Sequence, residues 1–138
     1  NSFKFALNDM ESNNWGRMIA ISSTAGLKGY SYISAYCASK HAVIGLTRSL
    51  SIELASKNIT VNSICPSYVD TPMTERTIKN ITDLTNLNKN QATKKLIEAN
   101  PQKRLIKPSE ISESILWLCN DNSSSINGQN ISLSGGEI

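Results

Sequence analysis

The sequence predicts an α/β protein in which helices pack on a parallel β-sheet. Residues 17–22 (RMIAIS) form a short apolar run bounded by turn signals, and residues 59–65 (ITVNSIC) alternate and are rich in β-branched side chains. Both runs are typical of strands, the first of a strand buried on both faces. Between them, apolar side chains recur at helical spacing, at Val43, Leu46, Leu50 and Leu54. A long helix over residues 34–56 that joins two such strands predicts that the strands are parallel, because parallel strands need a crossover connection.

The elements that flank this unit can also be placed. Residues 2–11 carry an apolar face and predict a helix, and the Asn-Asn-Trp-Gly stretch after it indicates a turn. Residues 24–34, which contain two glycines, form a loop between the first strand and the long helix. We expect the long helix to end near Asn58, because asparagine tolerates the left-handed conformation. Pro66 is expected to stop the second strand.

The second half of the chain predicts further helices and a last strand. Residues 72–101 are polar and contain two weak helical patterns, at 73–81 and 90–99. Another helix is expected to open at Pro108, since proline suits the first turn of a helix. Residues 130–134 (NISLS) then predict the last strand. Ligands of such sheets bind at the carboxyl ends of the strands, so a site is expected there.

Composition and charge argue against several classes of protein. The 138 residues suffice for one modest domain, and the net charge of +3 comes from 14 basic and 11 acidic residues that are interspersed. The sequence shows no basic patch interleaved with aromatic residues, which argues against nucleic acid as a partner. No apolar run approaches the ~20 residues of a membrane span.

The cysteines and the histidine predict neither a metal site nor a hydrolase. Cys37, Cys65 and Cys119 are scattered and form no C-x-x-C pair, which indicates reduced thiols in a cytoplasmic protein. His41 is the only histidine, and the sequence has no G-x-S-x-G elbow with which it could form a hydrolase triad.

Tyr36 and Lys40 are the strongest candidates for chemistry. They are four residues apart, so on a helix they lie on one face, one turn from each other. An ammonium group beside a phenol favours the phenolate and lowers the phenol pKa from its reference of about 10. Such a tyrosine can exchange a proton with a substrate oxygen, and Ser23, in the loop before the helix, could hydrogen-bond that oxygen. The pair alone is weak evidence, because a half-buried tyrosine and a solvent-reaching lysine give the same pattern.

A longer agreement supports the chemical interpretation. Residues 15–73 resemble, almost position by position, part of the second half of the short-chain dehydrogenase/reductase family. Three motifs stand in the family's order: ISS at residues 21–23, Y-x-x-x-K at 36–40 and N-x-x-x-P at 62–66. Tyr36 follows Ser23 by 13 positions, which is the family's spacing between its catalytic serine and tyrosine and favours Ser23 over Ser22.

The resemblance implies a Rossmann-like domain with a doubly wound parallel sheet. Such a domain binds NAD or NADP and moves a hydride between the nicotinamide and a secondary alcohol or ketone. Ser23, Tyr36 and Lys40 would then be catalytic. The stretch PSYVDT resembles the family's P-G-x-x-x-T, whose backbone and threonine hold the nicotinamide carboxamide. By this match the cofactor-binding residues are Tyr36, Lys40, Pro66, Val69 and Thr71. Ser67 stands where glycine is usual, and a positive φ there would strain the serine by about 1 kcal/mol.

The resemblance also implies a substrate class and partners. The segments NPQKRL, WLC and SGGE look most like those of reductases and dehydrogenases of 3-oxoacyl or 3-hydroxyacyl substrates, including 3-hydroxybutyrate. Residues 72–101 would be a mobile lid over the substrate, although a solvated insertion has the same composition. Tyr30, Tyr32 and Ile33 would line the substrate pocket or simply be exposed. The long helix would pair with its counterpart in another subunit, which predicts a homo-oligomer, either a dimer or a tetramer.

The resemblance covers only the C-terminal part of the family's domain. The glycine-rich phosphate-binding turn and the residue that selects between NAD and NADP have no counterpart in the sequence. We therefore expect residues 1–138 to be the C-terminal part of a single NAD(P)-binding domain, with about three strands and their flanking helices. Two alternatives stay open: a protein of the same fold that binds ligands without catalysis, and an inactive truncated piece. Such a piece is expected to be insoluble or molten by itself, because one edge of its sheet is unpaired.

Overall fold

The computed structural model describes residues 2–138 and contains a three-stranded parallel sheet. The strands β1 (Gly16–Ile21), β2 (Ile59–Pro66) and β3 (Asn130–Leu133) lie side by side in the order β1-β2-β3. The central strand β2 is buried along its whole length, as expected of a strand that has neighbours on both sides and helices on both faces. The predicted α/β class with a doubly wound parallel sheet is confirmed.

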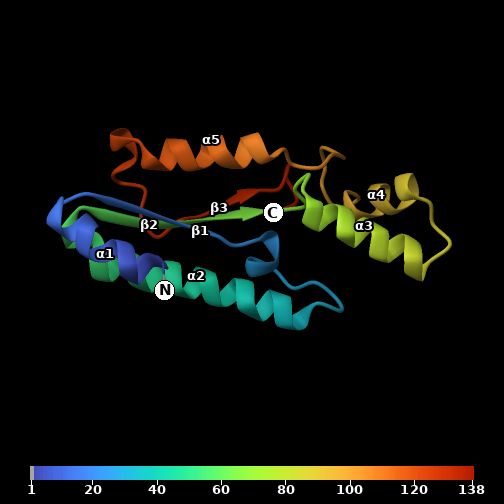
Figure 1. Cartoon of the computed structure of the whole chain (residues 1–138), viewed down its shortest axis with the longest axis horizontal. Helices are drawn as coiled ribbons and strands as arrows, with labels where there is room; N and C mark the ends of the chain where they lie inside the picture. Colours follow the sequence, from blue (N-terminus) through green and yellow to red (C-terminus); the bar gives the residue numbers. More distant parts are fainter. Residues whose placement is uncertain (1) are drawn as a thin grey trace.

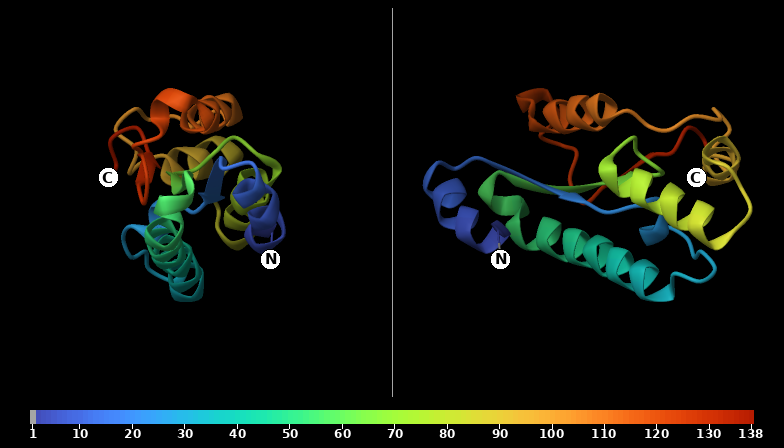
Figure 2. Two further views of the ribbon diagram at one scale, coloured as in Figure 1. Left: turned by 90° about the vertical axis from the view of Figure 1, so that its left-hand side faces the viewer. Right: turned by 45° about the vertical axis from the view of Figure 1, so that its right-hand side comes forward.

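Helices cover both faces of this sheet. Helices α1 (Ser2–Ser12) and α2 (Ser34–Leu54) lie on one face, and α5 (Pro108–Cys119) lies on the other (Figure 1). Figure 2 shows the same layers from two further directions. The core between α1, α2 and the sheet consists of buried apolar side chains, namely Met18, Leu54, Ile59 and Val61. Within the part of the chain that the structure describes, no helix has the length and apolar character that crossing a bilayer requires.

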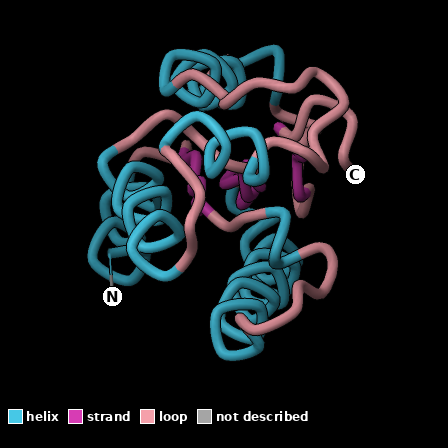
Figure 3. Tube along the Cα trace, turned by 90° about the vertical axis from the view of Figure 1, so that its right-hand side faces the viewer, coloured by secondary structure: helices cyan, strands magenta, loops and turns pink. Residues whose placement is uncertain are grey.

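Two shorter helices project beyond the carboxyl ends of the strands. Helices α3 (Pro72–Leu84) and α4 (Lys89–Leu96) pack against each other there (Figure 1). Figure 3 looks at the molecule from this end, with the strands between the helical layers. Each helix starts at a polar side chain that accepts a backbone N–H: Thr71 for α3 and Asn88 for α4. Such caps explain why these two segments become helices although their apolar patterns are weak.

The predicted boundaries differ from the observed ones by a few residues. Helix α2 ends at Leu54 and continues as a 3₁₀ turn, η2 (Ala55–Lys57), before Asn58, whose φ of 55° is left-handed as predicted. Strand β2 includes Pro66 instead of stopping before it. Pro66 is the last residue of the strand, where its missing N–H costs the least ladder pairing.

The asparagine of the N-x-x-x-P motif ties β2 to the turn that precedes β3. The Asn62 side-chain amide donates to the Ile126 carbonyl over 2.7 Å, and its Oδ1 accepts the Gln129 N–H over 2.9 Å. Asn62 is 1% exposed. One side chain thus satisfies two backbone groups that would otherwise lack a partner.

Candidate active site

The two serines at the end of β1 have different surroundings. The buried Ser22 hydroxyl donates to the Lys40 carbonyl over 3.0 Å, which fastens the end of the strand to α2. Ser23 is half-buried, and its Oγ accepts the Ala25 N–H over 3.1 Å at the start of the 3₁₀ turn η1 (Thr24–Gly26). Because Ser23 Oγ acts here as an acceptor, its hydroxyl hydrogen is free to donate to a ligand. This difference supports Ser23 over Ser22 as the serine of the site.

Tyr36 and Lys40 occupy the first two turns of α2 and lie on one face of it. The Lys40 ammonium donates to the Ile21 carbonyl over 3.0 Å and lies 5.6 Å from the centroid of the Tyr36 ring. The Tyr36 side chain is 43% exposed. Among residues 2–138 its phenol hydroxyl has no hydrogen-bond partner, so it is open to a ligand. The strand end therefore places the lysine next to the tyrosine.

A glycine allows this close approach between η1 and α2. A Cβ atom on Gly26 would lie 2.6 Å from Ser22 Oγ and 2.8 Å from the Lys40 carbonyl oxygen. Only the absence of a side chain lets the 3₁₀ turn sit directly on the backbone of α2. The same contact holds the neighbouring Ser23 near the helix that carries Tyr36 and Lys40.

The turn after β2 brings Pro66, Val69 and Thr71 to the same end of the sheet. Val69 lies beside Ile106 in an isolated parallel bridge, and the Val69 N–H has no acceptor among the described residues. The Thr71 hydroxyl donates to the Val69 carbonyl over 3.3 Å and accepts the Thr74 N–H over 3.5 Å. A free N–H and a weakly held hydroxyl on one short turn match the acceptor and donor groups of a carboxamide.

The strain that we considered at Ser67 is not present. Positive φ angles among residues other than glycine occur at Asn14, Tyr32, Asn58 and Lys103 and not at Ser67. The Ser67 N–H donates to the Leu133 carbonyl over 3.1 Å, and its hydroxyl donates to Glu137 over 2.8 Å. Serine is tolerated because its φ does not lie in the left-handed region that favours glycine.

The structure brings one carboxylate to this region that the sequence did not predict. Glu137, in the C-terminal tail, accepts hydrogen bonds from Tyr30 and Ser67 and forms an ion pair with Lys28 over 2.9 Å. Tyr30 is 107 positions from Glu137, so no local pattern could have paired them. The only signal in the sequence is an acidic residue directly after the Gly-Gly of the last segment.

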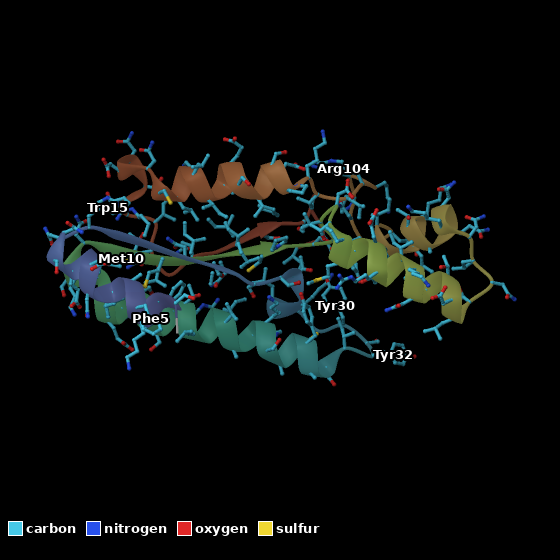
Figure 4. The ribbon with its side chains drawn as sticks, viewed as in Figure 1. Phe5, Met10, Trp15, Tyr30, Tyr32 and Arg104 are labelled. Carbon is cyan, nitrogen blue, oxygen red and sulfur yellow. The ribbon has the colours of Figure 1, made fainter. Side chains whose placement is uncertain are left out.

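The three loop residues that we considered as substrate contacts lie in different surroundings. Tyr30 is partly buried, and the Thr24 hydroxyl also lies 2.9 Å from its phenol oxygen. Tyr32 is fully exposed at the outer end of the loop, and Ile33 is 40% exposed. Figure 4 shows Tyr32 pointing away from the sheet and Tyr30 next to η1. Tyr30 therefore has a structural contact, whereas Tyr32 and Ile33 have exposed side chains.

One cavity is lined by none of Ser23, Tyr36 and Lys40, although Ile106 and Leu133 in its wall pair with Val69 and Pro66. It lies between the start of α5 and the C-terminal tail, and Arg104 and Glu110 line it. Arg104 and Glu110 form a two-point ion pair, with N–O distances of 2.7 and 2.8 Å. The hydrogen bond from Arg104 and that from the Lys107 N–H lower the pKa of Glu110 to about 2. We therefore interpret this ion pair as a support for the start of α5.

The arrangement can transfer a proton to or from an oxygen atom bound at the ends of β1 and β2. Tyr36 offers an exposed phenol, Lys40 offers a positive charge beside it, and Ser23 offers a free hydroxyl hydrogen. These are the groups that general acid–base chemistry at a carbonyl or alcohol needs. The turn after β2, with the Val69 N–H and the Thr71 hydroxyl, lies at the same end of the sheet.

Comparison with known proteins agrees with this arrangement. A family model described as enoyl-(acyl carrier protein) reductase matches residues 2–137. The chain is 35% identical to D-beta-hydroxybutyrate dehydrogenase of Rhizobium meliloti over 132 aligned residues. This alignment covers 95% of this chain and 51% of that protein. It is 34% identical to a 3-oxoacyl-(acyl-carrier-protein) reductase of Rickettsia felis, covering 96% of this chain and 51% of the relative.

A solved structure agrees as well. A variant of actinorhodin polyketide ketoreductase with NADPH matches with a TM-score of 0.86 and 33% identity, covering 93% of this chain and 49% of that one. The chain thus spans about half the length of the curated relatives and the solved structure it matches.

Proposed function

Because the chain belongs to the short-chain dehydrogenase/reductase family, we propose that it is part of an enzyme that moves a hydride between a nicotinamide and a secondary alcohol or ketone. The observation that carries the proposal is the placement of Lys40 beside Tyr36 at the carboxyl end of β1. Lys40 contacts the Ile21 carbonyl at the strand end and lies next to the Tyr36 ring, and Ser23 follows Ile21 by two residues.

In the proposed reduction, each of these residues has one task. Ser23 donates its free hydroxyl hydrogen to the substrate oxygen and holds it in place. Tyr36 gives its phenolic proton to that oxygen as the carbonyl becomes an alcohol, and in the reverse direction it accepts the proton. The Lys40 ammonium stabilises the negative charge that remains on the Tyr36 oxygen.

The cofactor of the proposal is NAD or NADP. When bound, the nicotinamide supplies or accepts the hydride that the side chains cannot provide. The Val69 N–H and the Thr71 hydroxyl would hold its carboxamide, and Pro66 starts the turn that presents them. Tyr36 and Lys40 would contact its ribose. The Val69 N–H supports this assignment, because it has no acceptor among the described residues and is available to a carboxamide oxygen.

We further propose a 3-oxoacyl or 3-hydroxyacyl compound as the substrate. Relatives that are about one-third identical to the chain are named for hydroxybutyrate and for oxoacyl groups on an acyl carrier protein. The two classes share a carbonyl or hydroxyl group at the third carbon and differ in the group attached to the first carbon. Residues 72–101 would close over this substrate as a lid, since α3 and α4 project past the strand ends and pack chiefly on each other.

We also propose that the full-length protein forms a homo-oligomer, either a dimer or a tetramer. Helix α2 exposes Leu46 (53%) and Ile52 (81%), and a Cβ on Gly45 would meet no atom within 4 Å. Large apolar side chains on a long helix favour a partner that covers them. Light scattering of the full-length protein and of a Leu46→Glu variant tests this, and a monomeric wild-type protein would contradict it.

The test of the proposed function uses the full-length protein. Purified enzyme is assayed with acetoacetyl and longer 3-oxoacyl thioesters and with free 3-hydroxybutyrate, each with both nicotinamides. We expect turnover of at least one substrate class and a loss of roughly 10²- to 10⁴-fold in kcat for Tyr36→Phe. A folded Tyr36→Phe protein that retains wild-type turnover would show that Tyr36 is not the acid. Nicotinamide binding without turnover of any substrate would favour a binding protein that has lost catalysis.

A further inference from the structure

Glu137 has a buried side chain at the end of the chain and contacts two loops of the proposed site. Its side chain is only 4% exposed. One oxygen accepts from the Lys28 ammonium over 2.9 Å and from the Tyr30 hydroxyl, and the other accepts from the Ser67 hydroxyl over 2.8 Å. Figure 4 shows Tyr30 beside η1, on the inner side of the loop. Both carboxylate oxygens are thus occupied by donors from other segments.

The surroundings keep this carboxylate ionised. Burial alone would raise the pKa of Glu137, but the hydrogen bonds from Tyr30, Lys28 and Ser67 outweigh burial and lower it. Burial and the neighbouring Glu137 raise the pKa of Tyr30 well above its usual range, so Tyr30 stays a donor. A buried carboxylate is tolerated only when its oxygens are paired in this way.

The donors come from the two loops that the proposed mechanism uses. Lys28 and Tyr30 lie in the loop that follows Ser23, and Thr24, next to Ser23, hydrogen-bonds the Tyr30 oxygen over 2.9 Å. Ser67 follows Pro66 in the turn assigned to the carboxamide.

The charge of Glu137 also acts on Tyr68, the next residue along that turn. Burial raises the pKa of Tyr68, and the negative charge of Glu137 raises it further.

We propose that Glu137 is a positioning residue that holds the substrate loop, residues 24–34, against the nicotinamide turn, residues 66–71. It acts through Lys28, Tyr30 and Ser67 and does not contact the reacting atoms. The inference rests on the proposed function, because only a hydride-transfer site needs these two loops in register. It also gives a reason for serine at position 67, whose hydroxyl supplies a donor that glycine lacks.

The test compares two carboxylate-to-amide variants of the full-length enzyme. Glu137→Gln keeps the size of the side chain and removes the charge that pairs with Lys28. Glu110→Gln is the matched control, because it breaks a two-point ion pair with Arg104 but contacts neither loop. We expect Glu137→Gln to lower kcat/KM for the carbonyl substrate roughly 10- to 100-fold, as misplaced groups do. Glu110→Gln should change it less than about threefold.

A second readout reports the loops directly. Amide hydrogen exchange of residues 24–34 and 66–71 should become faster in Glu137→Gln and stay at the wild-type rate in Glu110→Gln. The double variant Lys28→Met/Glu137→Gln should lose little more kcat/KM than Glu137→Gln alone, because both substitutions remove the same contact. A role in overall stability alone would accelerate exchange throughout the sheet as well.

The outcomes separate this inference from the proposed function. Wild-type kcat/KM and wild-type loop exchange in Glu137→Gln would overturn the positioning role while leaving hydride transfer intact. An unchanged Tyr36→Phe enzyme would overturn the proposed function, whatever the exchange shows. If Glu137→Gln fails to fold, the test uses Ser67→Ala and Lys28→Met, each of which removes one hydrogen-bond donor at a less buried position. Both variants must then show faster loop exchange and lower kcat/KM. Wild-type values in both would refute the inference.

Discussion

Replacing Asn62 with alanine should destabilise the fold strongly, although the side chain is remote from the chemistry. The substitution leaves the Ile126 carbonyl and the Gln129 N–H without the partners that now lie 2.7 and 2.9 Å away. Both hydrogen bonds are partly buried and are made by the buried Asn62 side chain, and a backbone group left unpaired there costs about 1–3 kcal/mol. Since both lie at the turn before β3, we expect the free energy of unfolding to fall by roughly 2–5 kcal/mol.

Urea denaturation of the full-length protein at a fixed concentration measures this loss. The matched control is Asn80→Ala, because Asn80 is exposed on α3 and makes no side-chain hydrogen bond among the described residues. The control should change the free energy of unfolding by no more than about 0.5 kcal/mol. The Gln129 amide should also exchange with solvent faster in Asn62→Ala. A loss below about 1 kcal/mol, with an unchanged Gln129 exchange rate, would refute the role that we assign to Asn62.

Further predictions concern the helix contact, the lysine and the ion pair. Gly26→Ala should destabilise the protein by about 1–3 kcal/mol in denaturation experiments, because its Cβ would overlap Ser22 Oγ and the Lys40 carbonyl; wild-type stability would contradict that contact. Lys40→Met should lower kcat roughly 10²-fold or more, and a folded variant with normal kcat would show that its charge is not used. The lowered pKa of Glu110 means that its pairing with Arg104 stabilises the fold above the ordinary value of 4.5 and is lost as the pH falls toward about 2. Between pH 5 and about 2.5, the free energy of unfolding should therefore fall more in the wild-type protein than in Glu110→Gln. An equal fall in the two proteins would contradict the pairing of Glu110 with Arg104.

Most of the fold could be predicted because its signals are local. The strand over residues 59–66 shows in β-branched alternation, α2 shows in its 3.6-residue period, and the left-handed Asn58 shows in the residue type itself. The observed boundaries differ from the predicted ones by a few residues, because tertiary pairing extends or shortens an element. The pairing of Pro66 with Leu133, for example, extends β2.

The candidate site was only partly predictable. Tyr36 and Lys40 are close in sequence, so helical geometry alone placed them on one face. The contacts of Glu137 with Lys28, Tyr30 and Ser67 join segments that are far apart in the chain. Such contacts depend on how the tail packs after β3, and neither period nor spacing encodes that path.

The experiment that tests the central claim most directly follows a label from the nicotinamide to the product. The full-length enzyme is mixed with a 3-oxoacyl thioester and a reduced nicotinamide that carries deuterium at the transferring position of C4. We predict deuterium on the carbinol carbon of the product, at a single-turnover rate, measured with saturating nicotinamide, that Tyr36→Phe lowers roughly 10²- to 10⁴-fold. Product without deuterium at that carbon, or an equal transfer rate in Tyr36→Phe, would contradict the assignment of Tyr36 as the proton donor for hydride transfer.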